Sequence, residues 1–155
     1  MLAVYKWMLN IFGWNNFIAR QPEDLRQKAS EFMREFSAIG TSSAFLTLIL
    51  FAILGLVLYY FVFTKFSSKR IKYRYRLTWW LVWFFLTSIL TMVITPLVMR
   101  LFMSWSDFLA GKFFWAVSLC NLIYSLVIFL IGSLIIVQFP KFTDASCTPF
   151  NRLKK

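Results

Sequence analysis

The stretch 44–64, AFLTLILFAILGLVLYYFVFT, contains no Asp, Glu, Lys or Arg. Two later stretches, 77–99 and 113–139, also lack these residues, and each of the three is longer than 20 residues. An α-helix rises about 1.5 Å per residue, so about 20 residues cross a hydrocarbon core of ~30 Å. The sequence therefore predicts an all-α, polytopic membrane protein with three transmembrane helices.

The composition agrees with a membrane location. Of the 155 residues, 60% are hydrophobic and 21% are aromatic, whereas soluble domains average about 45–50% apolar residues. The net charge of +11 would suggest nucleic acid as the partner of a soluble protein. No nucleic-acid recognition motif accompanies the charge, and cations that flank membrane spans bind anionic headgroups. We therefore expect membrane lipids, anionic ones in particular, as partners, and no nucleic acid.

A basic loop, residues 65–76, joins the first two spans and contains six cations and no acid. Loops rich in Lys and Arg stay on the cytoplasmic side of a membrane. We therefore expect this loop and the basic polar tail, residues 140–155, to be cytoplasmic and the N-terminal region to lie outside. The expected location is the bacterial inner membrane. The candidate contacts to anionic lipid, or alternatively to an acidic cytoplasmic partner, are Lys65, Lys69, Arg70, Lys72, Arg74 and Arg76.

Two amphipathic interfacial helices are predicted ahead of the spans, within an N-terminal region of residues 1–41. In the first, residues 1–19, a polar stripe of Lys6, Asn10 and Gly13 interrupts an otherwise apolar, Trp-containing surface. That pattern is typical of a helix lying in the membrane interface. A short fourth span is the alternative.

The second amphipathic helix begins near Pro22, and its apolar residues recur at helical spacing. They are Leu25, Ala29, Phe32, Met33 and Phe36. This face could rest on lipid or could bind a partner, and the sequence favours neither. Residues 39–43, IGTSS, are expected to break the helix and to cap the next one. The three-helix transmembrane domain then occupies residues 42–139.

Small and polar residues repeat along two of the spans. They are Thr87, Thr91 and Thr95 in the second, and Ser118, Asn121, Ser125 and Gly132 in the third. Such residues let helices approach closely, and a hydrogen bond between helices contributes roughly 0.6–2 kcal/mol. This helix-packing seam could serve one three-helix bundle or could join copies and partners. Three helices offer few ways to bury every polar side chain, which favours a homo-oligomer or a complex with other membrane subunits.

The chain offers little for catalysis. It contains no histidine, and its three spans contain no ionisable acid or base of the kind that transporters use. The two cysteines, Cys120 and Cys147, form no metal-binding or redox motif. We therefore expect no catalytic residue, cofactor or metal.

The expected function is a small, non-enzymatic membrane subunit that anchors or scaffolds a larger membrane assembly. The alternative is a self-assembling pore-forming or membrane-disrupting protein, either holin-like or toxin-like. Three spans, an external N-terminus and a basic internal tail resemble the layout of some phage holins. The resemblance is one of architecture only.

Overall fold

The computed structural model describes residues 2–63, 76–103 and 107–137. Every element within these ranges is helical, and they contain no strand. Three of the helices are long and apolar enough to cross a membrane: Glu23–Val62, Leu77–Phe102 and Gly111–Ile136. The predicted all-α class is confirmed, as are three apolar helices long enough to cross a membrane.

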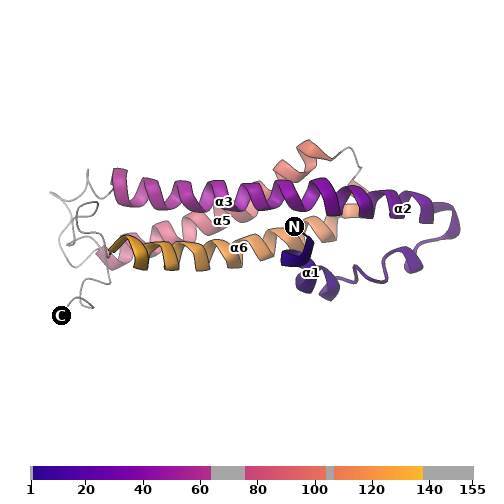
Figure 1. Cartoon of the computed structure of the whole chain (residues 1–155), viewed down its shortest axis with the longest axis horizontal. Coiled ribbons are helices and arrows are strands. Elements are labelled where there is room, and N and C mark those ends of the chain that lie inside the picture. The colour runs from indigo at the N-terminus through magenta and orange to yellow at the C-terminus, as the bar shows by residue number, and fades with distance from the viewer. Residues whose placement is uncertain (1, 64–75, 104–106, 138–155) are drawn as a thin grey trace.

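The helices form an elongated bundle (Figure 1). Its elements are α1 (Leu2–Ile11), η1 (Ile18–Arg20), α2 (Glu23–Glu35), η2 (Phe36–Gly40), α3 (Thr41–Val57), η3 (Leu58–Phe63), α5 (Arg76–Phe102) and α6 (Asp107–Val137). Helices α3 and α6 run in the same direction, and α5 runs between them in the opposite direction. Helix α2 prolongs α3 beyond the bundle, whereas α1 packs on the side of α6.

The predicted break at residues 39–43 is wrong, because one continuous helix runs from Glu23 to Val62. Residues 36–40 form a π-helical segment instead, in which Gly40 keeps right-handed helical angles, φ −59° and ψ −50°. The hydroxyl of Thr41 donates to the carbonyl of Ser37 at 2.8 Å, so it back-bonds within the helix rather than capping a new one. The 40-residue helix is about 60 Å long.

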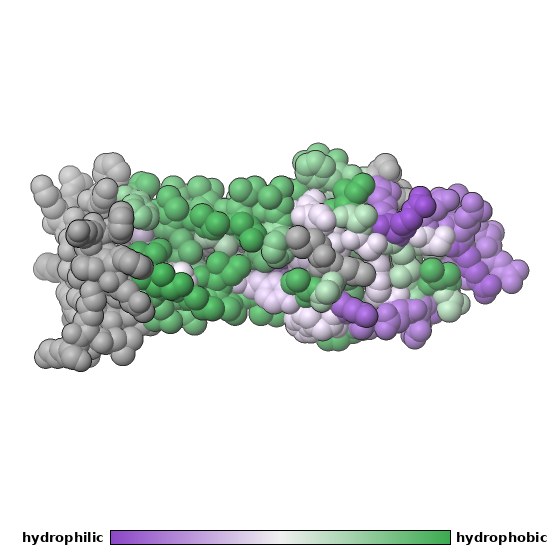
Figure 2. All heavy atoms as spheres, viewed as in Figure 1, coloured by the Kyte–Doolittle hydropathy of each residue, from purple (hydrophilic) through white to green (hydrophobic). Residues whose placement is uncertain are grey.

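The three long helices approach one another at glycines. A Cβ atom added at Gly55 of α3 would collide with the side chain of Thr87 on α5. One added at Gly132 of α6 would collide with Leu56 of α3. Along the spans most polar residues face inward, while large apolar side chains face outward. Figure 2 shows the resulting apolar surface along the bundle and the hydrophilic surface of the α2 end.

An aromatic cap closes the bundle where α2 leaves it. Its members are Trp14, Phe17, Phe32, Phe36 and Phe113, all of them buried. The Phe113 ring meets the Trp14 ring edge-on at 4.9 Å and the Phe17 ring at 5.0 Å. Such ring pairs contribute about 0.5–1.5 kcal/mol each beyond burial. The cap joins α2 to α6 and to the segment that follows α1.

The cap also covers the apolar face predicted on α2. Ala29, Phe32 and Phe36 are fully buried against the chain's own residues. Residues of the same chain therefore cover most of this face, an arrangement that neither interpretation of the sequence anticipated. Leu25 and Met33, at the edges of the face, are only partly buried.

A second aromatic cluster lies at the opposite end of the bundle. It consists of Leu56, Tyr59, Tyr60, Trp80 and Phe129. The indole N–H of Trp80 donates to the hydroxyl of Ser133 at 3.2 Å, which places these two residues of α5 and α6 at one level. The long helices are thus fixed by aromatic packing at both ends.

The helix directions generate a prediction about topology. A cysteine at Ser30, exposed on α2, and a cysteine at Ser68, in the basic loop, should react with impermeant reagents from opposite sides of the membrane. The background is Cys147→Ser, and Cys120 is buried. Labelling of both positions from one side would contradict the three-span topology.

The contact at Gly55 generates a second prediction. Gly55→Ala should lower the free energy of unfolding by about 1–3 kcal/mol, because the new methyl group overpacks against the branched Thr87 side chain. Gly111→Ala is the matched control, since nothing lies within 4 Å of a Cβ atom there. Denaturant titration of both variants in detergent measures the difference. Equal stability of the two variants would show that α3 and α5 do not approach at Gly55.

Candidate functional site

The side chain of Asn121 lies at the meeting point of four helices. Its Nδ2 donates to the backbone carbonyl of Ala44 in α3 and to Oγ1 of Thr95 in α5, both at 2.9 Å. Its Oδ1 accepts a hydrogen bond from the phenol of Tyr5 in α1, also at 2.9 Å. We call these four residues the Asn121 junction.

The junction satisfies the amide within a single chain. Asn121 is fully buried, and both of its donor hydrogens and its oxygen have partners. A buried polar group that loses its partner costs about 1–3 kcal/mol, and no water is at hand inside a membrane to replace it. The geometry therefore fixes the positions of α1, α3 and α5 relative to α6.

Tyr5 supplies the hydrogen bond from α1 as a neutral phenol. Burial is the main reason that the pKa of the Tyr5 phenol is raised above its ordinary value, and its neighbours Cys120 and Tyr124 raise it further. The hydrogen bond to Asn121 lowers this pKa, but by less than burial raises it. Tyr5 thus remains a donor at neutral pH.

A second contact fastens α1 one helical turn farther along α6. The hydroxyl of Tyr124 donates to the backbone carbonyl of Val4 at 2.7 Å and accepts a hydrogen bond from the indole N–H of Trp7 at 2.9 Å. Sequence reasoning missed Tyr5, Trp7 and Tyr124 as functional residues. The available signal was the spacing of Asn121 and Tyr124, which puts two polar tips on one face of an otherwise apolar helix.

The predicted helix-packing seam lies inside the single bundle. Six of its seven residues are buried: Thr87, Thr91, Thr95, Ser118, Asn121 and Ser125. Gly132, the seventh, is half-buried at its contact with Leu56. Thr91 and Ser125 approach across helices, with their hydroxyl oxygens 3.5 Å apart.

Several of these hydroxyls are satisfied by their own helix. Thr91, Thr95 and Ser118 donate to carbonyls four residues earlier, at 2.7–2.8 Å. One copy of the chain therefore buries these polar side chains without a second copy. The expected homo-oligomer or complex stays a prediction, because here α1 adds a fourth helix that supplies the Tyr5 hydrogen bond to Asn121.

The structure does not describe most of the predicted basic contact residues. Lys65, Lys69, Arg70, Lys72 and Arg74 lie outside the described residues. Arg76 begins α5, but its side chain is outside the described part as well. Their contacts to lipid or to an acidic partner stay a prediction.

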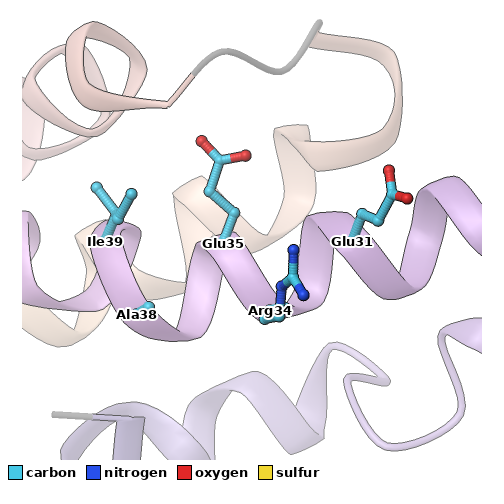
Figure 3. Close-up of a pocket in the computed structure, with 5 residues that line it drawn as sticks. All are labelled: Glu31, Arg34, Glu35, Ala38 and Ile39. Atoms are coloured by element: carbon cyan, nitrogen blue, oxygen red, sulfur yellow. The ribbon is translucent and has the colours of Figure 1, made fainter.

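A hollow of about 380 Å³ lies along one side of α2 and η2. It is lined by Glu31, Arg34, Glu35, Ala38 and Ile39. Figure 3 shows Glu31, Glu35 and Ile39 projecting from one side of the helix, as their spacing of four residues requires. The hollow combines both charge signs with an exposed isoleucine, a surface suited to protein contact.

The Asn121 junction generates a third prediction. Asn121→Leu should release α1 from the bundle, because Tyr5 loses its hydrogen-bond acceptor. The three long helices should still insert into the membrane. We expect a loss of roughly 1–3 kcal/mol in the free energy of unfolding and faster tryptic cleavage after Lys6. Tyr5→Phe should cause part of the same loss.

Combining the two substitutions measures their coupling. The double variant should lose less free energy of unfolding than the sum of the two single losses, because both substitutions remove the same hydrogen bond. Ser118→Ala is the control, since that hydroxyl bonds only within α6, to the carbonyl of Phe114. Strictly additive effects of Asn121→Leu and Tyr5→Phe would show that the two residues do not interact.

Comparison with known proteins adds no relative to this description. Protein-family models, curated proteins and solved structures were all searched, and none matches the chain. Function is therefore inferred from the geometry of the described residues, namely the Asn121 junction, the aromatic cap and the polar surface of α2.

Proposed function

We propose that this chain is a small, non-enzymatic integral-membrane subunit that anchors or scaffolds a larger membrane assembly. One observation carries the proposal. The polar side chains of the seam are buried and bonded within one copy, while the outward surface of α3, α5 and α6 is made of large apolar side chains. In such a bundle the polar side chains serve helix packing, and the apolar side chains face the lipid.

The long helix provides the anchoring geometry. Helix α2 is a continuation of the span α3, and the aromatic cap braces it against α6. The exposed side chains of α2 are mostly polar, and Glu31, Arg34 and Glu35 line the hollow. A protein bound at this surface is held at a fixed distance and angle from the membrane. We therefore propose the hollow as the contact to other subunits.

The proposal includes the location and partners expected from the sequence. The protein resides in the bacterial inner membrane, with residues 65–76 and the C-terminus cytoplasmic and the N-terminal region outside. Anionic lipids bind the basic loop, and α1 and α2 act at the membrane interface. Homo-oligomers or complexes with other membrane subunits form through the outward surface of α2.

The pore-forming alternative receives less support from the geometry. A pore needs polar side chains that line a water path. Here the amide of Asn121 has all its hydrogen bonds inside one copy, and Thr91 donates to its own helix. These side chains would have to break their bonds before they could line a channel between copies.

The fourth prediction tests the anchor directly. A C-terminally tagged chain, extracted from native membranes in mild detergent, should elute from gel filtration in a stoichiometric complex. Glu31→Lys with Arg34→Glu should dissociate that complex, because it reverses the charges at the hollow. The control exchanges an exposed pair at the start of α2, Glu23→Arg with Arg26→Glu, and keeps its ion pair. Retention of the complex by both variants would rule out the hollow as the contact.

A companion measurement separates the anchor from the pore. The purified protein should show no conductance in planar lipid bilayers. Reproducible conductance that disappears in the double variant Asn121→Leu, Thr91→Val would support the pore instead, since this variant removes polar lining without adding charge.

A further inference from the structure

The described helices mark out the thickness of the layer that they cross. Trp80 and Ser133 lie at one level, joined by their hydrogen bond. From Trp80 to Arg100, the next charged residue along α5, the helix rises about 30 Å. From Ser133 back to Lys112, the nearest charge on α6, it also rises about 30 Å. This spacing matches a hydrocarbon core of ~30 Å, with Arg100 and Lys112 at one boundary.

Helix α1 is fastened well inside that boundary. Its partners on α6, Asn121 and Tyr124, lie about 14 and 18 Å along the helix from Lys112. Helix α1 has 10 residues and is about 15 Å long, half the thickness of the layer. It is therefore too short to cross the layer as a fourth span. Side chains on a helix lean toward its N-terminus, so Asn121 and Tyr124 reach back toward Lys112, and Figure 1 shows α1 beside the half of α6 that begins at Asp107.

The outward face of α1 is built to meet lipid. Tyr5 and Leu9 are fully buried against the bundle, whereas Val4, Trp7 and Ile11 are 37%, 46% and 71% exposed. This exposed apolar face continues the lipid-facing surface of α6, where Ile123 and Val127 are also exposed. Lipid acyl chains are therefore the occupant that this face fits.

The polar stripe of α1 is consistent with that position. Lys6 and Asn10 are exposed and lie one helical turn apart. A lysine at this depth can bury its stem and extend its ammonium group to the headgroups. Trp7 supplies the amphipathic ring that is enriched at membrane interfaces.

Among the described residues, the two halves of the layer consequently hold different numbers of helices. At the level of the Asn121 junction, four helices meet: α1, α3, α5 and α6. At the level of the second aromatic cluster, the described residues contribute only the last turns of α3–η3 and parts of α5 and α6. We propose that the protein is a one-leaflet wedge, which displaces more lipid in the leaflet that holds α1 and accumulates where that leaflet is convex.

The physical basis is the cost of inserting a helix into a single leaflet. Binding of such helices depends on curvature, because convex bending opens space between headgroups. The inference rests on the membrane embedding proposed above and goes beyond the anchoring role. A subunit of this shape would direct its assembly to curved membrane.

The test uses the full chain reconstituted in giant vesicles from which narrow membrane tubes are pulled. The protein carries a fluorophore at Cys147, since Cys120 is buried. An impermeant quencher outside the vesicles leaves fluorescence only from molecules whose C-terminal tail is inside. Because α6 ends on the side opposite to α1, the α1 helix of these molecules is on the outer side. These molecules hold α1 in the outer leaflet, so their density in the tube relative to the flat membrane should exceed unity.

Molecules of the opposite orientation provide the internal control. Their α1 lies in the concave leaflet of the tube, so their relative density, obtained by subtraction from the unquenched signal, should fall below unity. Equal densities in tube and flat membrane for both orientations would overturn the wedge without affecting the anchor. Failure of the chain to enter the bilayer at all would instead refute the membrane embedding.

Variants locate the effect in α1. Deletion of residues 2–11 should bring both density ratios to unity, whereas Glu23→Arg with Arg26→Glu should leave them unchanged. If the deletion variant aggregates, the sign reversal between orientations of the unaltered chain still decides the question. Unchanged sorting by a folded deletion variant would show that α1 is not the wedge.

Discussion

An uncharged amide that is buried away from water must form its hydrogen bonds within the protein. In this bundle the buried amide is that of Asn121, and its partners come from three other helices. Its three bonds fix a carbonyl of α3, a hydroxyl of α5 and the phenol of Tyr5 at a single point on α6. No apolar contact in the bundle is as directional, because burial of hydrocarbon depends on area and not on angle. The docking of α1, the register of α5 and the depth of the junction all follow from this one side chain.

Aromatic packing holds the helices together beyond the Asn121 junction, at both ends of the bundle. The aromatic cap joins α2 to α6 at one end, and the cluster around Trp80 and Phe129 closes the other. Near the second of these clusters the helices approach closely, with Gly55 lying against the Thr87 side chain and Gly132 against the Leu56 side chain. Helices α2 and α3 belong to one continuous helix, and the aromatic cap packs α2 against α6, so the polar end is held in line with the span. The proposed anchoring role uses this alignment.

The same packing bears on how the protein assembles. With α1 in place, the bundle satisfies its own seam and leaves no unpaired amide at Asn121 to recruit a second copy. Association through the membrane surface would then depend on apolar shape alone, which gives little specificity in lipid. The charges of Glu31 and Arg34 beside the hollow offer directional contacts that the spans do not. Assembly is therefore better served by the polar end than by the membrane face.

The sequence by itself determined the helical class and the three apolar helices, because absence of charge over more than 20 residues is a local property that needs no knowledge of neighbours. It also identified Asn121 and the threonines as packing residues, but not their partners. Only the tertiary structure decided that IGTSS continues a helix, that the apolar face of α2 is covered from within, and that Tyr5 reaches Asn121 across 116 residues. A glycine followed by hydroxyl residues caps a helix or extends one according to what packs beside it, here Met103 against Gly40. Pairings between distant segments leave no periodic trace in the chain, since they depend on which surfaces the fold brings together.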